Sequence, residues 1–284
     1  MNTTFDFTRF KNLLAWHLVN NKKFYLNIFV SFTLAWLFLA VFLQIKLRDD
    51  VYPDPLILST SYSMFALPLI FGSCFFGFFA LATTIFRSVQ KKSQRINTRM
   101  LPASNLEKYL CMFMFISVGS LVLMLGALVV CDALQYLFSL LLMPGLRTSL
   151  IGLILQQDFH LLFLHGFENF WYPYIIQAAV HTYFIWQYTL CILGGSIYRK
   201  APVVMTGLSV IVLHFVLLFA YGYLADSDFF DITCYTPDGT HSYISPVWCT
   251  VFIGVMLALS AFNIFLSYRI FTRLQVISNK WLNL

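Results

Sequence analysis

Six long runs without a charged side chain constrain this chain more than any other feature. Each run is long enough to cross the roughly 30 Å hydrocarbon core of a bilayer, which takes about 20 helical residues. Backbone polar groups in lipid must be paired within their own segment, and the runs lack the alternation of strands. The sequence therefore predicts an all-α integral membrane protein with six transmembrane helices, at 24–45, 62–86, 109–131, 172–198, 201–225 and 243–268.

The charges separate into two groups along these runs. Of the 18 Lys and Arg residues, 15 lie in the N-terminal arm, in the loop 87–108, after the fourth run and after the sixth. Ten of the 12 acidic residues lie on the other side, mostly in the loops 132–171 and 226–242. This asymmetry predicts that both termini are cytoplasmic, and topology accounts for the net charge of +6 without nucleic-acid binding. The first run is expected to be an uncleaved signal anchor.

The arm 1–23 has apolar residues on one side of a helix. Phe7, Phe10, Leu14 and Leu18 follow helical spacing, with His17 beside Leu18, while basic and amide side chains occupy the rest of the wheel. Such a helix lies along the lipid headgroups with its apolar side in the acyl boundary. We expect an amphipathic interfacial helix at 1–23, followed by one six-helix transmembrane domain at 24–284.

The cytoplasmic loop 87–108 contains six basic residues: Arg87, Lys91, Lys92, Arg95, Arg99 and Lys108. Ser104 and Glu107 form a capping-box pattern, which predicts that a helix begins near Asn105. A sparse apolar stripe runs through the same loop at Val89, Ile96, Met100 and Leu101. The loop is either a surface that docks onto a partner or anionic lipid, or only the positive-inside signal.

Two short runs of the sequence resemble those of a known protein family. RMLPASNLEKYL (Arg99–Leu110) and GGSIYRKAPVVMTGL (Gly194–Leu208), together with the predicted architecture, resemble the membrane subunits of ATP-binding-cassette exporters of the type 2 permease (type V exporter) family. The runs are most similar to permease-like proteins of Bacteroidetes bacteria, which implies a bacterial inner membrane. In that family the N-terminal helix and the loop between spans two and three contact the ATPase.

The resemblance implies a coupling helix in the loop and a mechanical role for this chain. The implied contacts to the ATPase are Arg87, Lys91, Lys92, Arg95, Ile96 and Asn97. The chain has no G-x-x-x-x-G-K-[ST] motif, so ATP and Mg²⁺ are expected on a separate P-loop ATPase subunit, with no cofactor and no catalysis here. A second copy or a paralogue would complete a pathway for a hydrophobic or amphipathic cargo.

Polar residues inside the runs have two interpretations. His181, His214, Gln187 and Asn263 either hydrogen-bond between helices or line a transport pathway, and the first is commoner. The runs contain no carboxylate or cationic side chain, which disfavours an ion-coupled carrier. The hypotheses that remain beside an exporter are a non-transporting membrane protein with a binding or assembly role and a membrane-embedded metal hydrolase.

The hypothesis of a metal hydrolase rests on residues in the outer loops. Asp158, His165 and Glu168 fall near one helix face, where they would hold a zinc ion, although an amphipathic surface helix explains the segment better. The apolar stretch 150–155 is expected to form an additional helix at the outer surface. Of the six cysteines, only Cys234 and Cys249 lie near the outer face, where a disulfide is an open alternative.

Overall fold

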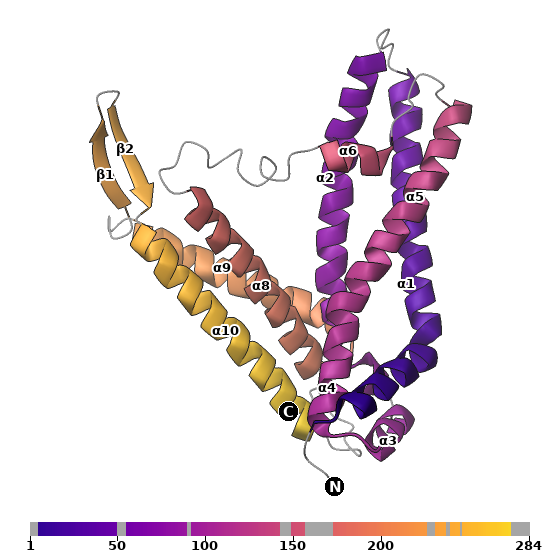
Figure 1. Ribbon diagram of the computed structural model, residues 1–284. Coiled ribbons are helices and arrows are strands. Elements are labelled where there is room, and N and C mark those ends of the chain that lie inside the picture. Colours follow the sequence, from indigo (N-terminus) through magenta and orange to yellow (C-terminus); the bar gives the residue numbers. More distant parts are fainter. Residues whose placement is uncertain are drawn as a thin grey trace. The chain divides into compact units, whose positions relative to one another are not determined.

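The computed structural model (Figure 1) describes residues 5–49, 55–89, 92–142, 149–156, 173–225, 231–236, 239–244 and 246–273. The chain divides into two compact units. The first unit comprises Met1–Leu81 and Leu110–Asp158, and the second comprises Ala82–Tyr109 and Phe159–Leu284. The basic loop therefore belongs to the same unit as the C-terminal helices.

Most of the described part of the first unit is formed by three long helices and one short helix. They are α1 (Phe7–Asp49), α2 (Pro55–Ala82), α5 (Ser120–Leu142) and the short α6 (Leu150–Gln156). Helix α5 continues from α4 (Asn105–Met114) through one π-helical turn, Phe115–Gly119, labelled η2. The extra helix expected at 150–155 is α6, which lies across the direction of α2 in Figure 1 and contacts α5.

Helix α1 is continuous over 43 residues and joins the segment expected to be interfacial to the first span without a break. At about 1.5 Å per residue it is about 65 Å long, roughly twice the thickness of a hydrocarbon core. Its first part, drawn in the darkest indigo, runs at an angle to the remainder (Figure 1). Asp6 begins the helix, because its Oδ1 accepts hydrogen bonds from the backbone N–H groups of Thr8 and Arg9 at 2.8 and 3.2 Å.

The core of the first unit forms where α1, α2 and α5 meet. Trp36 and Tyr62 are fully buried there, and α6 contributes Leu150, which is also fully buried. Trp36 Nε1 donates a hydrogen bond to Ser73 Oγ at 2.7 Å, which links α1 to α2. A buried indole needs such an acceptor, so its partner on α2 fixes the pairing of the two helices.

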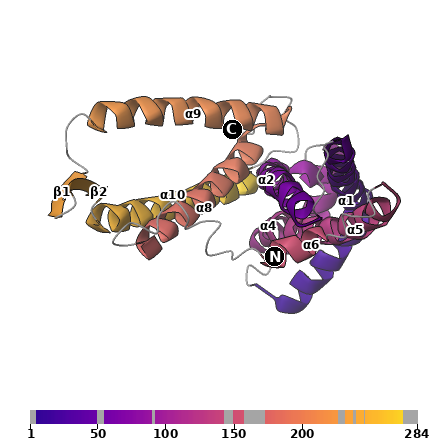
Figure 2. The same cartoon turned by 90° about the horizontal axis from the view of Figure 1, so that it is seen from above.

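The second unit contains the basic loop and three long helices, α8 (Pro173–Ile197), α9 (Pro202–Ala225) and α10 (Pro246–Arg273). Helix α8 packs along α10 and also contacts α9. Figure 2 shows α8 crossing from α10 towards α9. The turn from α8 into α9 places Ala201 at φ 47°, a left-handed conformation, directly before Pro202 at the first position of the helix.

A β-hairpin interrupts the predicted all-α architecture. Strand β1 (Asp231–Thr236) pairs antiparallel with β2 (Gly239–Ile244), and Thr236 is opposite Gly239. Alternating β-branched and aromatic residues on either side of the Pro237, Asp238, Gly239 turn sequence favour this pairing. The predicted sixth span consequently begins later than expected, at Pro246 instead of Tyr243.

Five helices of the described residues are long and apolar enough to cross a membrane. They are Phe7–Leu47, Ser61–Val89, Asn105–Leu141, Pro202–Phe219 and Val247–Arg273. Helix α8 has 25 residues and no charged side chain, but it is not among the five because Gln177, His181 and Gln187 lower its apolar character. The protein is therefore a helical integral membrane protein with at least these five helices of membrane-spanning character.

Candidate functional site

The basic loop is folded into defined elements. A 3₁₀ turn (η1, Arg87–Val89) precedes α3 (Lys92–Met100), and α4 begins at Asn105. The capping box is confirmed: Ser104 N–H donates to Glu107 Oε2 at 2.8 Å, and Glu107 N–H donates to Ser104 Oγ at 3.2 Å. The Glu107 side chain is fully buried. The start of α4 is therefore fixed by two reciprocal hydrogen bonds.

Arg95 occupies the inside of this loop. Its side chain is only 3% exposed, and Nε donates a hydrogen bond to the Val89 carbonyl oxygen at 2.7 Å. This bond connects α3 to η1. Burial lowers the pKa of Arg95 below its usual value, and the positive charges of Arg199 and Arg99 lower it further. Arg95 therefore holds the loop together from within.

The other residues implied in partner contact are distributed differently. Arg87 and Asn97 are exposed, and Ile96 is partly buried. Lys91 lies outside the described residues, as does the side chain of Lys92, the first residue of α3. Among the described side chains of the set, Arg87 and Asn97 are accordingly those at the surface.

The N-terminal part of α1 packs with one face and leaves another uncovered. Leu13 and His17 are buried, and His17 lies 4.7 Å from Phe115 between ring centroids. His17 Nε2 also hydrogen-bonds Tyr25 Oη at 3.1 Å. Of the residues expected to face lipid, Phe7 and Leu18 are exposed, and Phe10 and Leu14 are partly buried.

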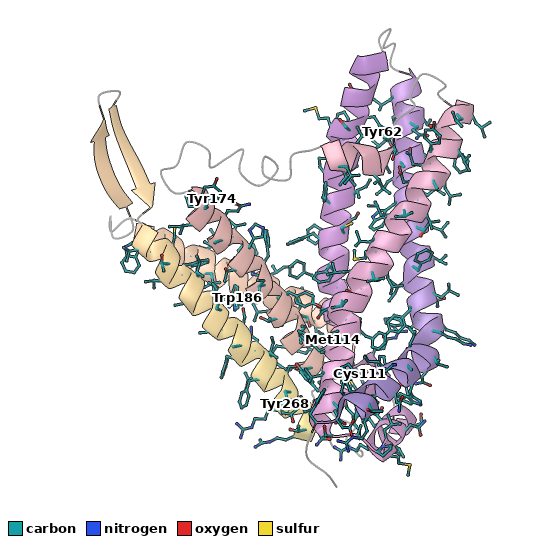
Figure 3. The ribbon with its side chains drawn as sticks, in the orientation of Figure 1. Tyr62, Cys111, Met114, Tyr174, Trp186 and Tyr268 are labelled. Carbon is teal, nitrogen blue, oxygen red and sulfur yellow. The ribbon has the colours of Figure 1, made fainter. Side chains whose placement is uncertain are left out.

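His214 forms the polar connection between α8 and α9. Its Nδ1 lies 2.7 Å from the Val210 carbonyl oxygen, which accepts hydrogen bonds but cannot donate them, so Nδ1 carries a proton. Nε2 of the neutral ring then accepts from the Tyr183 hydroxyl and the Gln187 amide, both on α8. Trp186, labelled in Figure 3, lies next to this group, 6.5 Å from the His214 ring between centroids.

The remaining two polar residues singled out from the sequence lie apart from His214. Asn263 on α10 is buried and donates from Nδ2 to Thr189 Oγ1 on α8 at 3.2 Å. His181 is exposed, and its Nδ1 lies 2.7 Å from the Gln177 carbonyl oxygen of its own helix. The structure thus gives Gln187, His214 and Asn263 helix–helix hydrogen bonds and places His181 on an outer face of α8.

The polar group around His214 makes a specific prediction about coupling between its members. Tyr183→Phe and Gln187→Leu are each expected to lower stability by about 0.5–1 kcal/mol, because the other residue still donates to His214 Nε2. The double variant should lose more than the sum, since Nε2 then has no donor. Thermal unfolding in detergent measures the effect, with Tyr174→Phe on the exposed end of α8 as control. Strictly additive losses would contradict a shared acceptor.

A buried polar network in the first unit was not predicted from the sequence. Gln44 on α1 donates from Nε2 to Gln135 Oε1 on α5 at 2.7 Å, and Tyr62 Oη on α2 donates to the same oxygen at 3.2 Å. All three side chains are fully buried, and Tyr62 is labelled in Figure 3. The glutamines within or near apolar runs were the only signal in the sequence. These hydrogen bonds join α1, α2 and α5.

Asp132 continues this network to α6. Its Oδ1 accepts from Gln135 Nε2 at 3.2 Å and from the Leu150 N–H at 2.6 Å, while Oδ2 accepts from Ser149 Oγ at 2.5 Å. Asp132 lies well inside α5, which ends at Leu142, although the sequence placed it in an outer loop. The uncharged run 109–131 is thus shorter than the membrane-length helix Asn105–Leu141, which contains this carboxylate. Its hydrogen bonds are those of a structural anchor for α6.

Two consecutive glycines allow α8 to approach its neighbours closely. A Cβ on Gly194 would lie 2.4 Å from Thr206 Cγ2 on α9, and a Cβ on Gly195 would lie 2.2 Å from the Thr83 carbonyl oxygen. Gly207 on α9 differs, because nothing lies within 4 Å of its Cβ position. The run GGSIYRKAPVVMTGL thus includes both Gly194 and Thr206, which meet in the close contact between α8 and α9, and the turn that joins these two helices.

The structure bears differently on the zinc site and on the disulfide considered from the sequence. Asp158, His165 and Glu168 lie outside the described residues, and the described part of the chain has no group of three His, Cys, Asp or Glu side chains suited to a metal ion. Cys249 is a free, buried thiol, so the alternative of a Cys234–Cys249 disulfide is wrong.

Comparisons with known proteins return no match to a protein-family model, to a curated protein or to a solved structure.

Proposed function

We propose that this chain is the membrane subunit of an ABC-type exporter of the inner membrane of a bacterium, with six transmembrane helices and both termini in the cytoplasm. The observation that carries the proposal is the folded basic loop between α2 and α4. A loop that served only as a topology signal would need charge alone. This one has an internal arginine hydrogen bond and a capping box, which make it stiff enough to transmit a force.

In this proposal, α8 also crosses the membrane and brings the number of transmembrane helices to six. Its polar side chains lower its hydropathy, yet Gln187 bonds to α9 and Thr189 bonds to α10. Polar groups paired between helices are tolerated in a membrane, so α8 inserts with its neighbours. With α8 counted, the strongly basic segments lie on one side of the bilayer.

The proposed mechanism assigns the chemistry to another polypeptide. A separate P-loop ATPase binds ATP and Mg²⁺, because this sequence lacks the motif that would hold the phosphates. Closure of the ATPase pushes the basic loop, and the helices rearrange around a pathway completed by a second copy or a paralogue. The cargo is hydrophobic or amphipathic, in keeping with the apolar residues of the spans.

The coupling role is tested by placing negative charge at the loop surface. Arg95 is unsuitable because its substitution would unfold the loop from within. The double variant Arg87→Glu, Asn97→Glu changes two exposed side chains instead and is expected to release the ATPase during purification while inserting normally. A charge reversal at an exposed position at the other end of α1, Lys46→Glu, should keep the ATPase. Full retention of the ATPase by the loop variant would remove the coupling role.

A further inference from the structure

A single π-helical turn interrupts the long helix that follows the basic loop. This turn, η2, has α4 before it and α5 after it, and the residues on either side, Met114 and Ser120, both have α-helical dihedral angles. It lies well inside the membrane-length helix Asn105–Leu141. A π-turn holds about one residue more than an α-turn, and π-turns within α-helices are frequent at functional sites. The turn therefore places α4 one residue out of register with α5.

Ser120 provides the hydrogen bonds that complete this turn. In an α-helix its N–H would donate to the Ile116 carbonyl oxygen, but here it donates to the Phe115 oxygen. The Ser120 hydroxyl donates to the Ile116 oxygen instead, and the Ser117 carbonyl oxygen lies 3.0 Å from the same hydroxyl. Ile116 and Ser120 are both buried, where a carbonyl oxygen without a donor is costly. Because the hydroxyl has a second acceptor, these groups stay paired whether the turn is π or α.

The N-terminal part of α1 holds α4 at the start of the turn. The Phe115 ring lies 4.7 Å from His17 and stacks on Tyr25 at 5.5 Å, both between ring centroids. Cys111 lies four residues before Phe115, on the same face of the helix, and is labelled in Figure 3. It is only 1% exposed, and its Sγ lies 3.8 Å from the Leu13 carbonyl oxygen. The π form of the turn thus goes with this face of α4 packed on α1.

We propose that η2 is a conformational switch, which turns α4 relative to α5 by changing between a π and an α form. The α form winds the same residues more tightly, so α4 turns by about 100° and moves along its axis by about 1.5 Å, the step of one residue. Each residue of α4 then takes about the place of the residue before it. Cys111 leaves the Leu13 oxygen for the place of Leu110, which is partly exposed.

The switch is connected to the basic loop through α4. This helix begins at Asn105, directly after the capping-box residue Ser104, and runs without a break into η2. A turn of α4 therefore moves the end of the basic loop, and a push on the loop favours one form of the turn. Only this use in transport rests on the proposed function. The switch itself is a property of this chain alone.

Two variants shift the switch in opposite directions. Ser120→Ala removes the donor on which the Ile116 oxygen depends in the π form, so it favours the α form. Deletion of the exposed Val118 places Ser120 four positions after Phe115. The backbone hydrogen bond between these two residues then becomes α-helical, and α4 keeps its packing on α1 without a π-turn.

The test measures how fast N-ethylmaleimide modifies Cys111 in the full-length protein, in mild detergent and without an ATPase. Peptide mass spectrometry follows every cysteine in the same sample. Cys131, fully buried on α5, reports general loosening of the fold. The control variant is Ser139→Ala, which removes a comparable bond from a buried hydroxyl to the Tyr136 carbonyl oxygen at 2.7 Å, away from the turn. Because no ATPase is present, the outcome is independent of the proposed function.

Ser120→Ala is expected to raise the modification rate of Cys111 about fivefold, the effect of losing one buried hydrogen bond, and to leave that of Cys131 unchanged. Deletion of Val118 should lower the rate at Cys111 to that at Cys131, and Ser139→Ala should leave the rate at Cys111 unchanged. An equal rise at both cysteines in Ser120→Ala would overturn the proposal, because the serine would then only stabilise the fold. A rate at Cys111 that neither change at the turn affects would exclude the switch as well.

Discussion

Gly195→Ala is expected to destabilise the second unit by about 3 kcal/mol or more, the upper end of the cost of overpacking. The added methyl group would lie 2.2 Å from the Thr83 carbonyl oxygen, 2.6 Å from its carbonyl carbon and 2.7 Å from its Cα. All three atoms are backbone, so no side chain can rotate away. The end of α8 would have to separate from the segment that follows α2.

Two other glycines provide a graded control. Gly194→Ala meets only the side chain of Thr206, which can move, so the expected loss is smaller, about 1–2 kcal/mol. Gly207→Ala enters open space and should leave stability unchanged or slightly raised, because Ala favours helix more than Gly. Thermal unfolding in detergent should rank the three variants in this order. Equal stability of Gly195→Ala and Gly207→Ala would refute the close approach.

Asp132→Ala is expected to detach α6 from the first unit and to lower stability by about 2–4 kcal/mol. The substitution removes an acceptor from Gln135, Ser149 and the Leu150 N–H together. Leu150 is fully buried, so its N–H would lose its partner away from water. The neighbouring Cys131 is fully buried as well, and its rate of modification by a thiol reagent should rise.

Asp132→Asn provides the matched variant for this anchor. The amide oxygen still accepts from the Leu150 N–H, and the Ser149 hydroxyl can turn to accept from the amide nitrogen. We therefore expect a loss of only about 1 kcal/mol and little change in the reactivity of Cys131. If Asp132→Ala were as stable as Asp132→Asn, the carboxylate would not be the anchor of α6.

The positions of the helices and the start of α4 could be predicted from the sequence because they depend on residues that are close together in the chain. Uncharged runs of sufficient length have one stable state in lipid, and every one of the six lies largely within a helix of the structure. The capping box was predictable for the same reason, since Ser104 and Glu107 are three residues apart and need no distant partner.

Contacts between distant residues were not predictable in this way. Gln44 and Gln135 are 91 residues apart, and only the packing of α1 on α5 brings their amides together. Asp132 was assigned to an outer loop because a carboxylate normally ends a membrane run. It stays inside the helix because Gln135 of α5, Ser149 directly before α6 and the Leu150 N–H at the start of α6 donate hydrogen bonds to it. A carboxylate that accepts from a neighbouring helix start does not mark a helix end.

Arg95 illustrates the same limit for a charged loop. An arginine among five other basic residues suggests exposure, and the sequence assigned it to the partner surface. The structure buries it because the Val89 carbonyl oxygen, left open at the end of a 3₁₀ turn, needs a donor. Of the described residues proposed for partner contact, Arg87 and Asn97 are the ones with exposed side chains.

The central claim is that a separate ATPase drives this chain through its basic loop. Purification of the tagged protein from its native membranes in a mild detergent, followed by mass spectrometry and an ATP hydrolysis assay, tests it most directly. The account predicts a P-loop ATPase in stoichiometric amount and hydrolysis in the eluate. A pure preparation without an ATPase and without hydrolysis would contradict it and would favour a non-transporting membrane protein with a binding or assembly role.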